Sequence, residues 1–352
     1  MTLLLSEEDV VASLDMRSTI DALEVGFRSL AVGEAVNRPR SHTYTRRSPS
    51  TNYLFKTMDG SIPSFGVHAL RISSDMVEEV GERRNKIPAA PGNRFVGLIM
   101  LFDIDELVPL AIMPDGALQR TRVGATSALA ARHMARTEAR TVGIIGSGWQ
   151  AMTQLEGLVV ERSVTSALVY SPTAAHLDQF CAKASQQFNI DVTGGGSAQD
   201  VIDQSDIVAL ATNSMSPVID GSWLRPGLHI GSVQGYELDQ STLQRADVIG
   251  VRSEHPATHH FAPGQAPKEA RQEPQLDPAV GAKMATLGDI IMGRSGRTSD
   301  DQVTLFVGSH VGASAGLGVQ FAAAAVAVFR KAQLSGLGRE LPTEWFTQLG
   351  KP

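Results

Sequence analysis

Apolar residues follow two different patterns along this chain. From residue 141 onward, short apolar runs alternate with longer helical segments, and four runs stand out at 141–145, 166–170, 207–212 and 228–231. They are rich in Val, Ile, Leu and Ala, which is typical of strands that are buried on both faces. Strands that alternate with helices predict a parallel sheet with right-handed crossovers.

The region before this alternation has another pattern. Residues 1–33 indicate a short strand, a helix that starts at Ser6, and an amphipathic helix that ends near Gly33. An Ala-rich helix that opens at Arg122 leads from this region into the first parallel strand. Between the helix that ends near Gly33 and the helix that opens at Arg122, short β-type segments are broken by Gly, Pro and Asn. This pattern predicts an antiparallel sheet or a partial barrel. These segments are 42–45, 52–55, 65–72 and 95–103.

Residues 252–277 are rich in Pro, Gln, Glu and His and indicate a long loop or an irregular helix. His255, His259 and His260 lie close together in this range. Prolines interrupt the regular element that would hold metal ligands, and no Cys or paired carboxylate completes a ligand set, so we expect no metal site. Order returns with a helix in 286–297, a last strand in 301–306 and an Ala-rich helix over 317–332.

Composition narrows the class of protein. A chain of 352 residues is long enough for two domains, and 42% hydrophobic with 19% charged residues is typical of a soluble globular protein. The net charge of −6 gives no basis for binding nucleic acid or an anionic membrane surface. The single cysteine, Cys181, excludes an intramolecular disulfide. Acids in place of a basic leader near the first residue predict a cytoplasmic location.

The first parallel strand runs into a glycine-rich turn. Gly146, Ser147, Gly148, Gln150 and Ala151 fit the G-x-G-x-x-G/A dinucleotide fingerprint. In such a turn the first glycine makes the tight bend, the second lets the backbone approach a pyrophosphate, and the last small residue allows close packing of helix on strand. The alternative is a glycine-rich turn in a domain without nucleotide, and the order of the surrounding strands disfavours it.

The end of the second parallel strand bears on the choice of cofactor. Ser171 and Thr173 stand where an NAD-selecting site usually has Asp or Glu for the ribose 2′-OH. Hydroxyls without a carboxylate tolerate a 2′-phosphate, so we expect NADP(H), with NAD(H) as the alternative because no arginine stands beside them. Further cofactor-binding candidates are Thr212, Asn213 and Val233.

The first region carries cations that the face of a sheet does not require: Arg40, Lys56, His68 and Arg71. For any one of them, a solvated surface position is the simpler interpretation. Arg122 differs, because it opens the helix that leads into the nucleotide strand and would there face a cleft between domains. A guanidinium at this place can hold a substrate carboxylate through two hydrogen bonds.

Longer stretches add to these signals. They occur in the order PGNRFVGLIMLFD, PLAIMPDGALQRTRVGATSALAARHMAR joined to TVGIIGSGWQAMTQLEGL, ELDQSTLQRADVIGV, and TLGDIIMGRSGR with DQVTLF. With them, nearly the whole chain resembles the ornithine cyclodeaminase and mu-crystallin family. The resemblance implies an α/β fold with a Rossmann-type doubly wound parallel sheet in the NAD(P)-binding domain, 123–314. It also implies a homodimer and a smaller α+β domain for substrate binding and dimerisation, formed by 1–122 and 315–352.

Members of this family use NAD(H) or NADP(H) on small amino or imino acids, as cyclodeaminases, alanine dehydrogenases, opine-type dehydrogenases and ketimine reductases. Mu-crystallins also bind thyroid hormone. By position, the resemblance assigns Arg122 to the substrate carboxylate. It assigns Gly148, Gln150 and Ala151 to the nucleotide, and Ser309 to the neighbourhood of the nicotinamide.

Two departures from the family pattern affect the chemistry. Where the family has a lysine in the substrate strand, this chain has His68, so the role falls to His68 or Arg71 or is vacant. The catalytic Asp of cyclodeaminases is absent from 231–237. Cyclisation with deamination needs a general base, whereas reduction of a protonated imine needs hydride positioning, a carboxylate clamp and a proton source. The departures therefore argue against ornithine cyclodeamination.

We expect an NAD(P)-dependent oxidoreductase that acts on the C–N bond of a small α-amino or α-imino acid. Arg122 would hold the carboxylate, with Arg40 and Arg71 as further substrate-binding candidates, and His68 or Lys56 would exchange the proton. Two alternatives stay open: a non-catalytic, NADPH-dependent ligand-binding protein of the mu-crystallin type, and an ornithine cyclodeaminase-like lyase.

Overall fold

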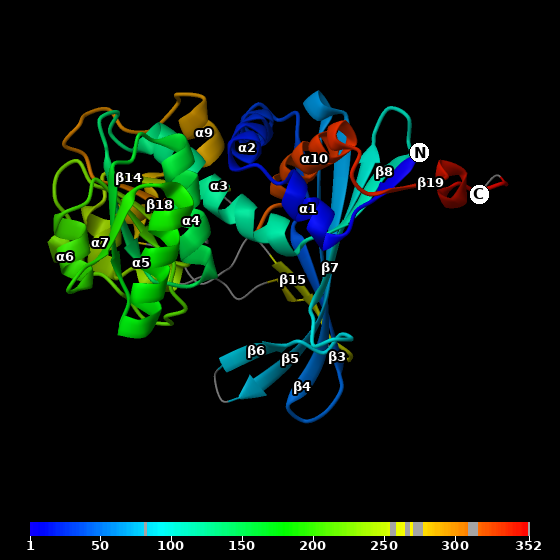
Figure 1. Ribbon diagram of the computed structural model, residues 1–352, viewed down its shortest axis with the longest axis horizontal. Helices are drawn as coiled ribbons and strands as arrows, with labels where there is room; N and C mark the ends of the chain where they lie inside the picture. Colours follow the sequence, from blue (N-terminus) through cyan, green and yellow to red (C-terminus); the bar gives the residue numbers. More distant parts are fainter. Residues whose placement is uncertain (81–82, 254–257, 265–267, 270–276, 309–315, 351–352) are drawn as a thin grey trace.

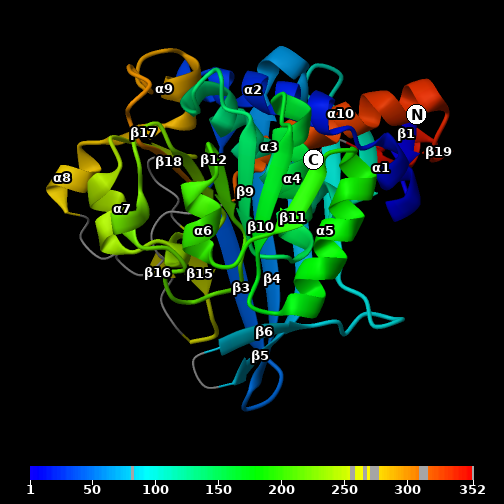
Figure 2. The same cartoon turned by 60° about the vertical axis from the view of Figure 1, so that its left-hand side comes forward.

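Two β-sheets, connected by the long helix α3 (Gly116–Met134), make up the structure (Figure 1). The computed structural model describes residues 1–80, 83–253, 258–264, 268–269, 277–308 and 316–350. We call the sheet on the left of Figure 1 the parallel sheet and the one on the right the mixed sheet. Figure 2 shows the parallel sheet in front of the long strands of the mixed sheet. No helix in the described ranges is long and apolar enough to cross a membrane.

The parallel sheet has eight strands in the order β11-β10-β9-β12-β13-β18-β14-β17, and every pairing in it is parallel. All residues of β12, β13, β14 and β18 are buried, as strands with helices on both faces require. This is the predicted Rossmann-type, doubly wound sheet. Its strands are β9 (Thr141–Ile145), β10 (Ser166–Tyr170), β11 (Asp191–Gly194), β12 (Ile207–Leu210), β13 (His229–Ser232), β14 (Val248–Val251), β17 (Met284–Thr286) and β18 (Thr304–Val307). Its helices are α4 (Trp149–Glu161), α5 (Ala174–Phe188), α6 (Ala198–Asp203), α7 (Gln240–Arg245), α8 (Pro278–Gly281) and α9 (Leu287–Ile291).

The mixed sheet has the order β16-β15-β3-β4-β5-β7-β8-β1-β19, with β2 paired to β4 and β6 to β5. Its centre is antiparallel, as the sequence predicted. Its strands are β1 (Thr2–Leu4), β2 (Val36–Asn37), β3 (Arg40–Arg46), β4 (Thr51–Ile62), β5 (Val67–Val80), β6 (Arg83–Ile87), β7 (Val96–Asp103), β8 (Pro109–Pro114), β15 (Thr258–Phe261), β16 (Lys268–Glu269) and β19 (Arg339–Leu341). Helices α1 (Glu7–Ser13), α2 (Met16–Ala31) and α10 (Gly318–Ser335) lie beside them.

Strands β15 and β16 differ from the sequence prediction. Residues 252–277 indicated a long loop or an irregular helix, yet β15 pairs in parallel with β3 and β16 pairs with β15. The unpaired backbone at the edge of β3 supplies the hydrogen-bonding partner, and no local signal reports such an edge. The predicted nucleotide-binding range, 123–314, thus contributes these strands to the mixed sheet.

Helix α3 begins before the point that the sequence indicated. It starts at Gly116 rather than at Arg122, because the carboxylate of Glu7 accepts a hydrogen bond from the backbone N–H of Ala117 at 2.8 Å and satisfies the free helix end. Over residues 121–131, α3 is buried on all sides, as the short side chains of its Ala-rich sequence allow. The predicted domain boundary at residue 122 falls within this helix.

Two glycines allow α3 to pack closely on α4. A Cβ atom at Gly124 would overlap the backbone carbonyl of Thr153, and a Cβ at Gly157 would lie 2.8 Å from the carbonyl oxygen of Gly124. Real side chains do not approach backbone atoms so closely, so any larger residue must push the helices apart. Because α4 follows the glycine turn, this contact fixes the turn relative to α3.

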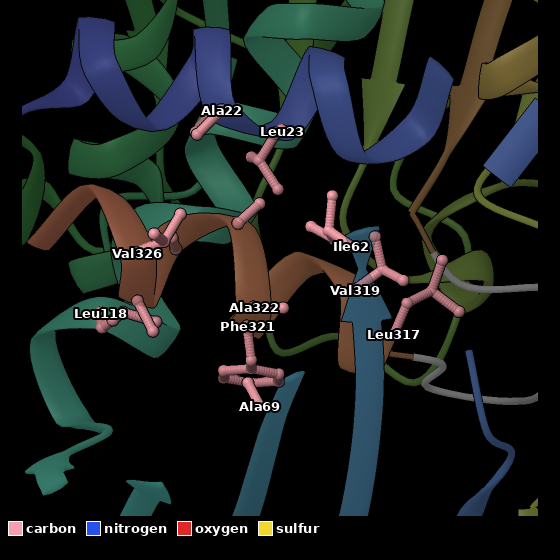
Figure 3. Packing of buried hydrophobic residues seen from close by; sticks show 14 of the residues in the cluster. Ala22, Leu23, Ile62, Ala69, Leu118, Leu317, Val319, Phe321, Ala322 and Val326 are labelled. Carbon is pink, nitrogen blue, oxygen red and sulfur yellow. The ribbon is translucent and has the colours of Figure 1, made fainter. Parts of the chain in front are cut away.

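The largest core cluster lies between α10, α2 and the mixed sheet (Figure 3). Leu23 and Ala22 of α2 face α10 from one side, and Phe321 of α10 points towards Ala69 of β5 on the other. Phe321 and Ala69 are completely buried. Helix α10, which belongs to the last part of the chain, therefore completes the core of the first part.

We predict that Gly124→Ala destabilises the protein by about 2 kcal/mol, because the new methyl group forces α3 from α4 and overpacking typically costs about 1–3 kcal/mol. Urea unfolding measures the change in free energy. Gly281→Ala is the matched control, since a Cβ there meets nothing within 4 Å. Equal stability of both variants would show that the α3–α4 contact is not tight.

Candidate cofactor and substrate site

A cavity of about 1030 Å³ lies at the carboxyl ends of the parallel strands, where β10 and β12 lie on either side of β9. Chain order reverses at this point, which is where doubly wound sheets bind nucleotides. One end of the cavity is formed by the glycine turn, and the other reaches α3. Of the predicted cofactor-binding residues, the cavity is lined by Gly146, Ser147, Gly148, Gln150, Ser171, Thr173, Thr212, Asn213 and Val233.

Of the two other predicted cofactor residues, Ala151 does not line the cavity. Ala151 is completely buried in the first turn of α4, where its small side chain lets the helix lie close to the sheet. Ser309 lies outside the described residues.

The glycine turn has the geometry of a phosphate-binding turn. Gly146 has a φ of +112°, and a Cβ there would overlap the carbonyl of Ala211, so only glycine fits. A Cβ at Gly148 would meet nothing within 4 Å, which leaves room for a ligand beside the backbone. No side chain caps the N-terminus of α4, and its first backbone N–H groups and positive dipole end are available to an anion.

The side of the cavity next to β10 is lined by hydroxyl groups and a histidine. Ser171 accepts a hydrogen bond of 2.8 Å from Ser147, and Thr173 and His176 follow on the same side. No carboxylate lines the cavity in the described residues. The sequence analysis missed His176, which is one helical turn beyond Thr173 and therefore projects back towards the strand end.

Glu237 organises the loops at the far side of the cavity. Its buried carboxylate accepts hydrogen bonds from the backbone N–H of Thr212 at 2.6 Å and of Gln234 at 3.0 Å, and from the hydroxyl of Ser232 at 2.9 Å. Glu237 therefore holds together the loops that follow β12 and β13. Sequence analysis missed this role, although an acid three residues after Gln234 is a capping-box signal.

Register in the mixed sheet divides the predicted basic residues between two faces. His42 pairs with Lys56 and Met58 pairs with Arg71, so Arg40, Lys56 and Arg71 project from the same face. His68 is three residues before Arg71 on β5 and projects from the opposite face. Its ring lies 3.5 Å from Asp59, with 37% of the side chain exposed.

Arg122 lies at the inner end of the cavity, together with Arg252 and Gly316. A Cβ at Gly316 would be 3.0 Å from Nη2 of Arg122 and 3.1 Å from Nη2 of Arg40, so these two guanidinium groups meet beside one backbone position. Arg40, Lys56 and Arg71 do not line the cavity itself. The site therefore has a basic wall that continues from the cavity into the mixed sheet.

Neutral and aromatic groups hold Arg122. Its Nη1 donates to Oε1 of Gln320 at 2.9 Å, and its guanidinium carbon lies 4.4 Å from the ring centre of Phe321. Burial, then the charges of Arg252, Arg71 and Arg40, lowers the pKa of Arg122. A buried guanidinium among like charges is stabilised by an anionic ligand.

Lys56 and Lys86 share one carboxylate, that of Asp75. Nζ of Lys56 is 3.0 Å from Asp75, and the other carboxylate oxygen of Asp75 is 3.0 Å from Nζ of Lys86. Burial, then the charge of Lys86, lowers the pKa of Lys56 to about 8. An amine with such a pKa can both give and take a proton near neutral pH. Of His68 and Lys56, only Lys56 is on the face of the arginines.

Comparison with known proteins identifies the family of the chain. The sequence model of the ornithine cyclodeaminase/mu-crystallin family matches residues 1–336. A Δ¹-pyrroline-2-carboxylate reductase of Bacillus cereus is 30% identical over 251 residues, which cover 70% of this chain and 74% of the relative. The alanine dehydrogenase of Archaeoglobus fulgidus is 23% identical, and the match covers 97% of this chain and 98% of that relative.

Among solved structures, the Δ¹-pyrroline-2-carboxylate reductase of Thermococcus litoralis, in complex with NADH and L-proline, superposes with a TM-score of 0.75. It is 26% identical, and the match covers 97% of this chain and 100% of that one. Both sheets and nearly the full length of the chain are thus shared with this structure. The chain belongs to the ornithine cyclodeaminase/mu-crystallin family.

Proposed function

We propose that the protein is an NADP(H)-dependent oxidoreductase acting on the C–N bond of a small α-imino or α-amino acid. The observation that carries the proposal is the position of Arg122, a buried arginine at the inner end of a cavity whose outer end is a phosphate-binding turn. The related enzymes from Bacillus cereus and Thermococcus litoralis, named as pyrroline-2-carboxylate reductases, support the same reaction class.

The residues around the cavity fit a nicotinamide dinucleotide. Gly146 makes the tight turn, and Gly148 leaves space for the pyrophosphate at the uncapped start of α4. Thr212 and Val233 would line the nicotinamide half, held in place by Glu237 and its loop contacts. When bound, the reduced cofactor supplies a hydride to the substrate, and the oxidised cofactor accepts one in the reverse direction.

The residues at the end of β10 support NADP(H) over NAD(H). Ser171, Thr173 and His176 provide hydrogen-bonding groups without a carboxylate that would repel a 2′-phosphate. The Thermococcus litoralis relative was solved with NADH, so the choice of nucleotide within the family has to be tested for this chain.

The chain's own residues supply the other parts of the chemistry. Arg122 and Arg40, whose Nη2 atoms meet beside Gly316, would bind the α-carboxylate and orient the substrate. Lys56, on the same face as Arg40, would hold the proton that the substrate nitrogen takes up on reduction. His68 projects from the other face and would take no part. The homodimer and the cytoplasmic location stay predictions.

The first prediction from this proposal concerns turnover. Incubation with NADPH and a panel of imines, including Δ¹-pyrroline-2-carboxylate and 2-oxo acids mixed with ammonium or methylamine, should oxidise the cofactor. Arg122→Met should lower kcat/KM by about 100-fold, because charge-assisted hydrogen bonds contribute about 1.5–3 kcal/mol each, and should leave the Kd for NADPH within about threefold.

Tight NADPH binding without turnover on any imine would instead support a ligand-binding protein of the mu-crystallin type. Conversion of ornithine to proline at a comparable rate would contradict the argument against cyclodeamination. An equal loss of cofactor binding and turnover in Arg122→Met would mean that Arg122 does not belong to the substrate site.

The second prediction concerns pH. Because the protonated form of Lys56 is the acid for reduction and its pKa is lowered to about 8, kcat/KM for imine reduction should fall as pH rises through about 8. Lys56→Met should lower kcat/KM by about 10²–10⁴, the usual contribution of a general acid, and abolish that fall.

Lys86→Met is the matched control for the pH profile. The change removes a positive charge that helps to lower the pKa of Lys56, so the pKa of Lys56 should rise. The fall in kcat/KM should therefore move to higher pH, while the rate at neutral pH persists. If kcat/KM falls at the same pH in the wild type and in Lys86→Met, the group that titrates belongs to the substrate and not to Lys56.

The third prediction concerns the nucleotide. Ser171→Asp should raise the Kd for NADPH by at least about tenfold, since it places a carboxylate beside the 2′-phosphate, and leave the Kd for NADH within about threefold. Fluorescence titration measures both constants, with Ser171→Ala as the uncharged control. A wild-type protein that binds NADH more tightly than NADPH would overturn the assignment.

A further inference from the structure

Gln320 of α10 is a completely buried amide that binds Arg122. Its Oε1 accepts hydrogen bonds from Nη1 of Arg122 at 2.9 Å and from the backbone N–H of Leu317 at 3.0 Å. Its Nε2 donates to the hydroxyl of Thr126 at 2.7 Å, and that hydroxyl donates to the backbone carbonyl of Arg122 at 2.7 Å. Both polar atoms of the amide therefore have partners, and α10 is tied to the turn of α3 that carries Arg122.

The partners of the amide decide which of its atoms is the oxygen. Nη1 of Arg122 and the backbone N–H of Leu317 can only donate, so the atom that they share has to accept. The hydroxyl of Thr126 uses its hydrogen for the carbonyl of Arg122, so the atom beside it has to donate. A glutamine meets both conditions, whereas a glutamate would place an oxygen where a donor is needed. The network thus favours an uncharged residue at position 320.

The contact with Gln320 also orients the guanidinium of Arg122. Nη1 is held by the amide, and the ring of Phe321, the next residue of α10, has its centre 4.4 Å from the guanidinium carbon. Nη2 lies beside Gly316, which lines the cavity, since a Cβ there would be 3.0 Å from this atom. Helix α10 therefore holds one edge of the guanidinium, and Nη2 is at the end of the cavity.

Arg71 provides a comparison within the same protein. Its guanidinium carbon lies 5.3 Å from the centre of the same Phe321 ring, and it is as deeply buried as Arg122. Arg71, however, has the carboxylate of Asp115 at 2.7 Å from its Nε and 2.5 Å from its Nη2, which neutralises its charge. In the described ranges no carboxylate lies within ion-pair distance of Arg122. Of the two arginines, the one that is held by an amide lines the cavity.

We infer that Gln320 is a positioning residue that makes the substrate site selective for a carboxylate. An acid at this position would form an ion pair with Arg122 and neutralise it, so a substrate carboxylate would have to compete with that acid. The neutral amide satisfies Nη1 and leaves the positive charge of Arg122 for the ligand. An uncharged analogue of the substrate then binds more weakly, because it supplies no counter-ion for a buried guanidinium.

This inference rests on the proposed oxidoreductase function, and Gln320→Glu tests it through a change of one polar group. The hydroxyl of Thr126 can turn its hydrogen towards the new carboxylate, which would pair with Arg122. We expect KM for the best imino acid of the panel to rise by about 10–100-fold, as the loss of one charge-assisted hydrogen bond predicts, and kcat to change by less than about threefold. The Kd for NADPH should stay within about threefold.

The charge of the ligand gives a readout that a purely structural role of Gln320 would not change. Calorimetry on the complex with NADP⁺ compares L-proline with L-prolinamide, and L-alanine with L-alaninamide. We expect the wild type to bind the carboxylate of at least one pair about tenfold or more tightly than the amide, and Gln320→Glu to reduce this preference to less than about threefold. Gln320→Met, which is similar in size and uncharged, should weaken binding but keep the preference.

A double-mutant cycle tests whether Gln320 acts through Arg122. In the Arg122→Met background, adding Gln320→Glu should change the carboxylate preference by less than about threefold, because the guanidinium on which Gln320 acts is absent. Gln333→Glu changes an exposed glutamine in the last turn of α10 and is the matched control for a new negative charge on this helix. It should leave KM and the carboxylate preference within about threefold of the wild type.

The outcomes separate this inference from the proposed function. An unchanged carboxylate preference in Gln320→Glu, an equal loss of preference in Gln320→Met, or an undiminished effect in the Arg122→Met background would overturn the role of Gln320 and leave the oxidoreductase function standing. Absence of turnover on every imine would overturn the function, and calorimetry, which needs no turnover, would still test Gln320. Absence of both turnover and amino-acid binding would overturn both.

Discussion

The packing of α3 between the two sheets is the constraint on which the rest of the structure depends. One helix carries Arg122 on one side and meets α4 through Gly124 on another. Because α4 begins at the glycine turn, the distance from the phosphate site to the carboxylate site is set by a contact between two rigid helices. Alanine and glycine are required along α3 for this reason, and larger side chains would move the two halves of the site apart.

Local signals in the sequence were sufficient for the cofactor turn and for five strands of the parallel sheet, β9, β10, β12, β13 and β18, but not for β11, β14 and β17. Strand β10 coincides with its predicted range, 166–170, and the G-x-G-x-x-A pattern lies between a buried strand and a helix. Such features depend on neighbouring residues: β-branched runs form buried strands, and only glycine adopts the φ of Gly146. The same holds for Ser171 and Thr173, which follow directly from the end of a strand.

Features that depend on pairing between distant segments could not be predicted. The sequence does not say which face of β5 is buried, so His68 and Lys56 were equal candidates until the β4–β5 register separated them. Glu237 was missed because its partners lie on loops after two different strands. Arg252 was missed as well, since it lies in a Pro-rich range that resembled a loop, and only the order of strands brings it to Arg122.

Strand β15 has a consequence for the distance between the two sheets. The chain passes from Val251, at the end of β14 in the parallel sheet, to Thr258, which is hydrogen-bonded along the edge of the mixed sheet. At about 3.5 Å per residue, this connection can extend to about 25 Å at most. The length of the chain therefore sets an upper limit on the distance between the end of β14 and the edge of the mixed sheet, and Arg252 is the first residue after β14.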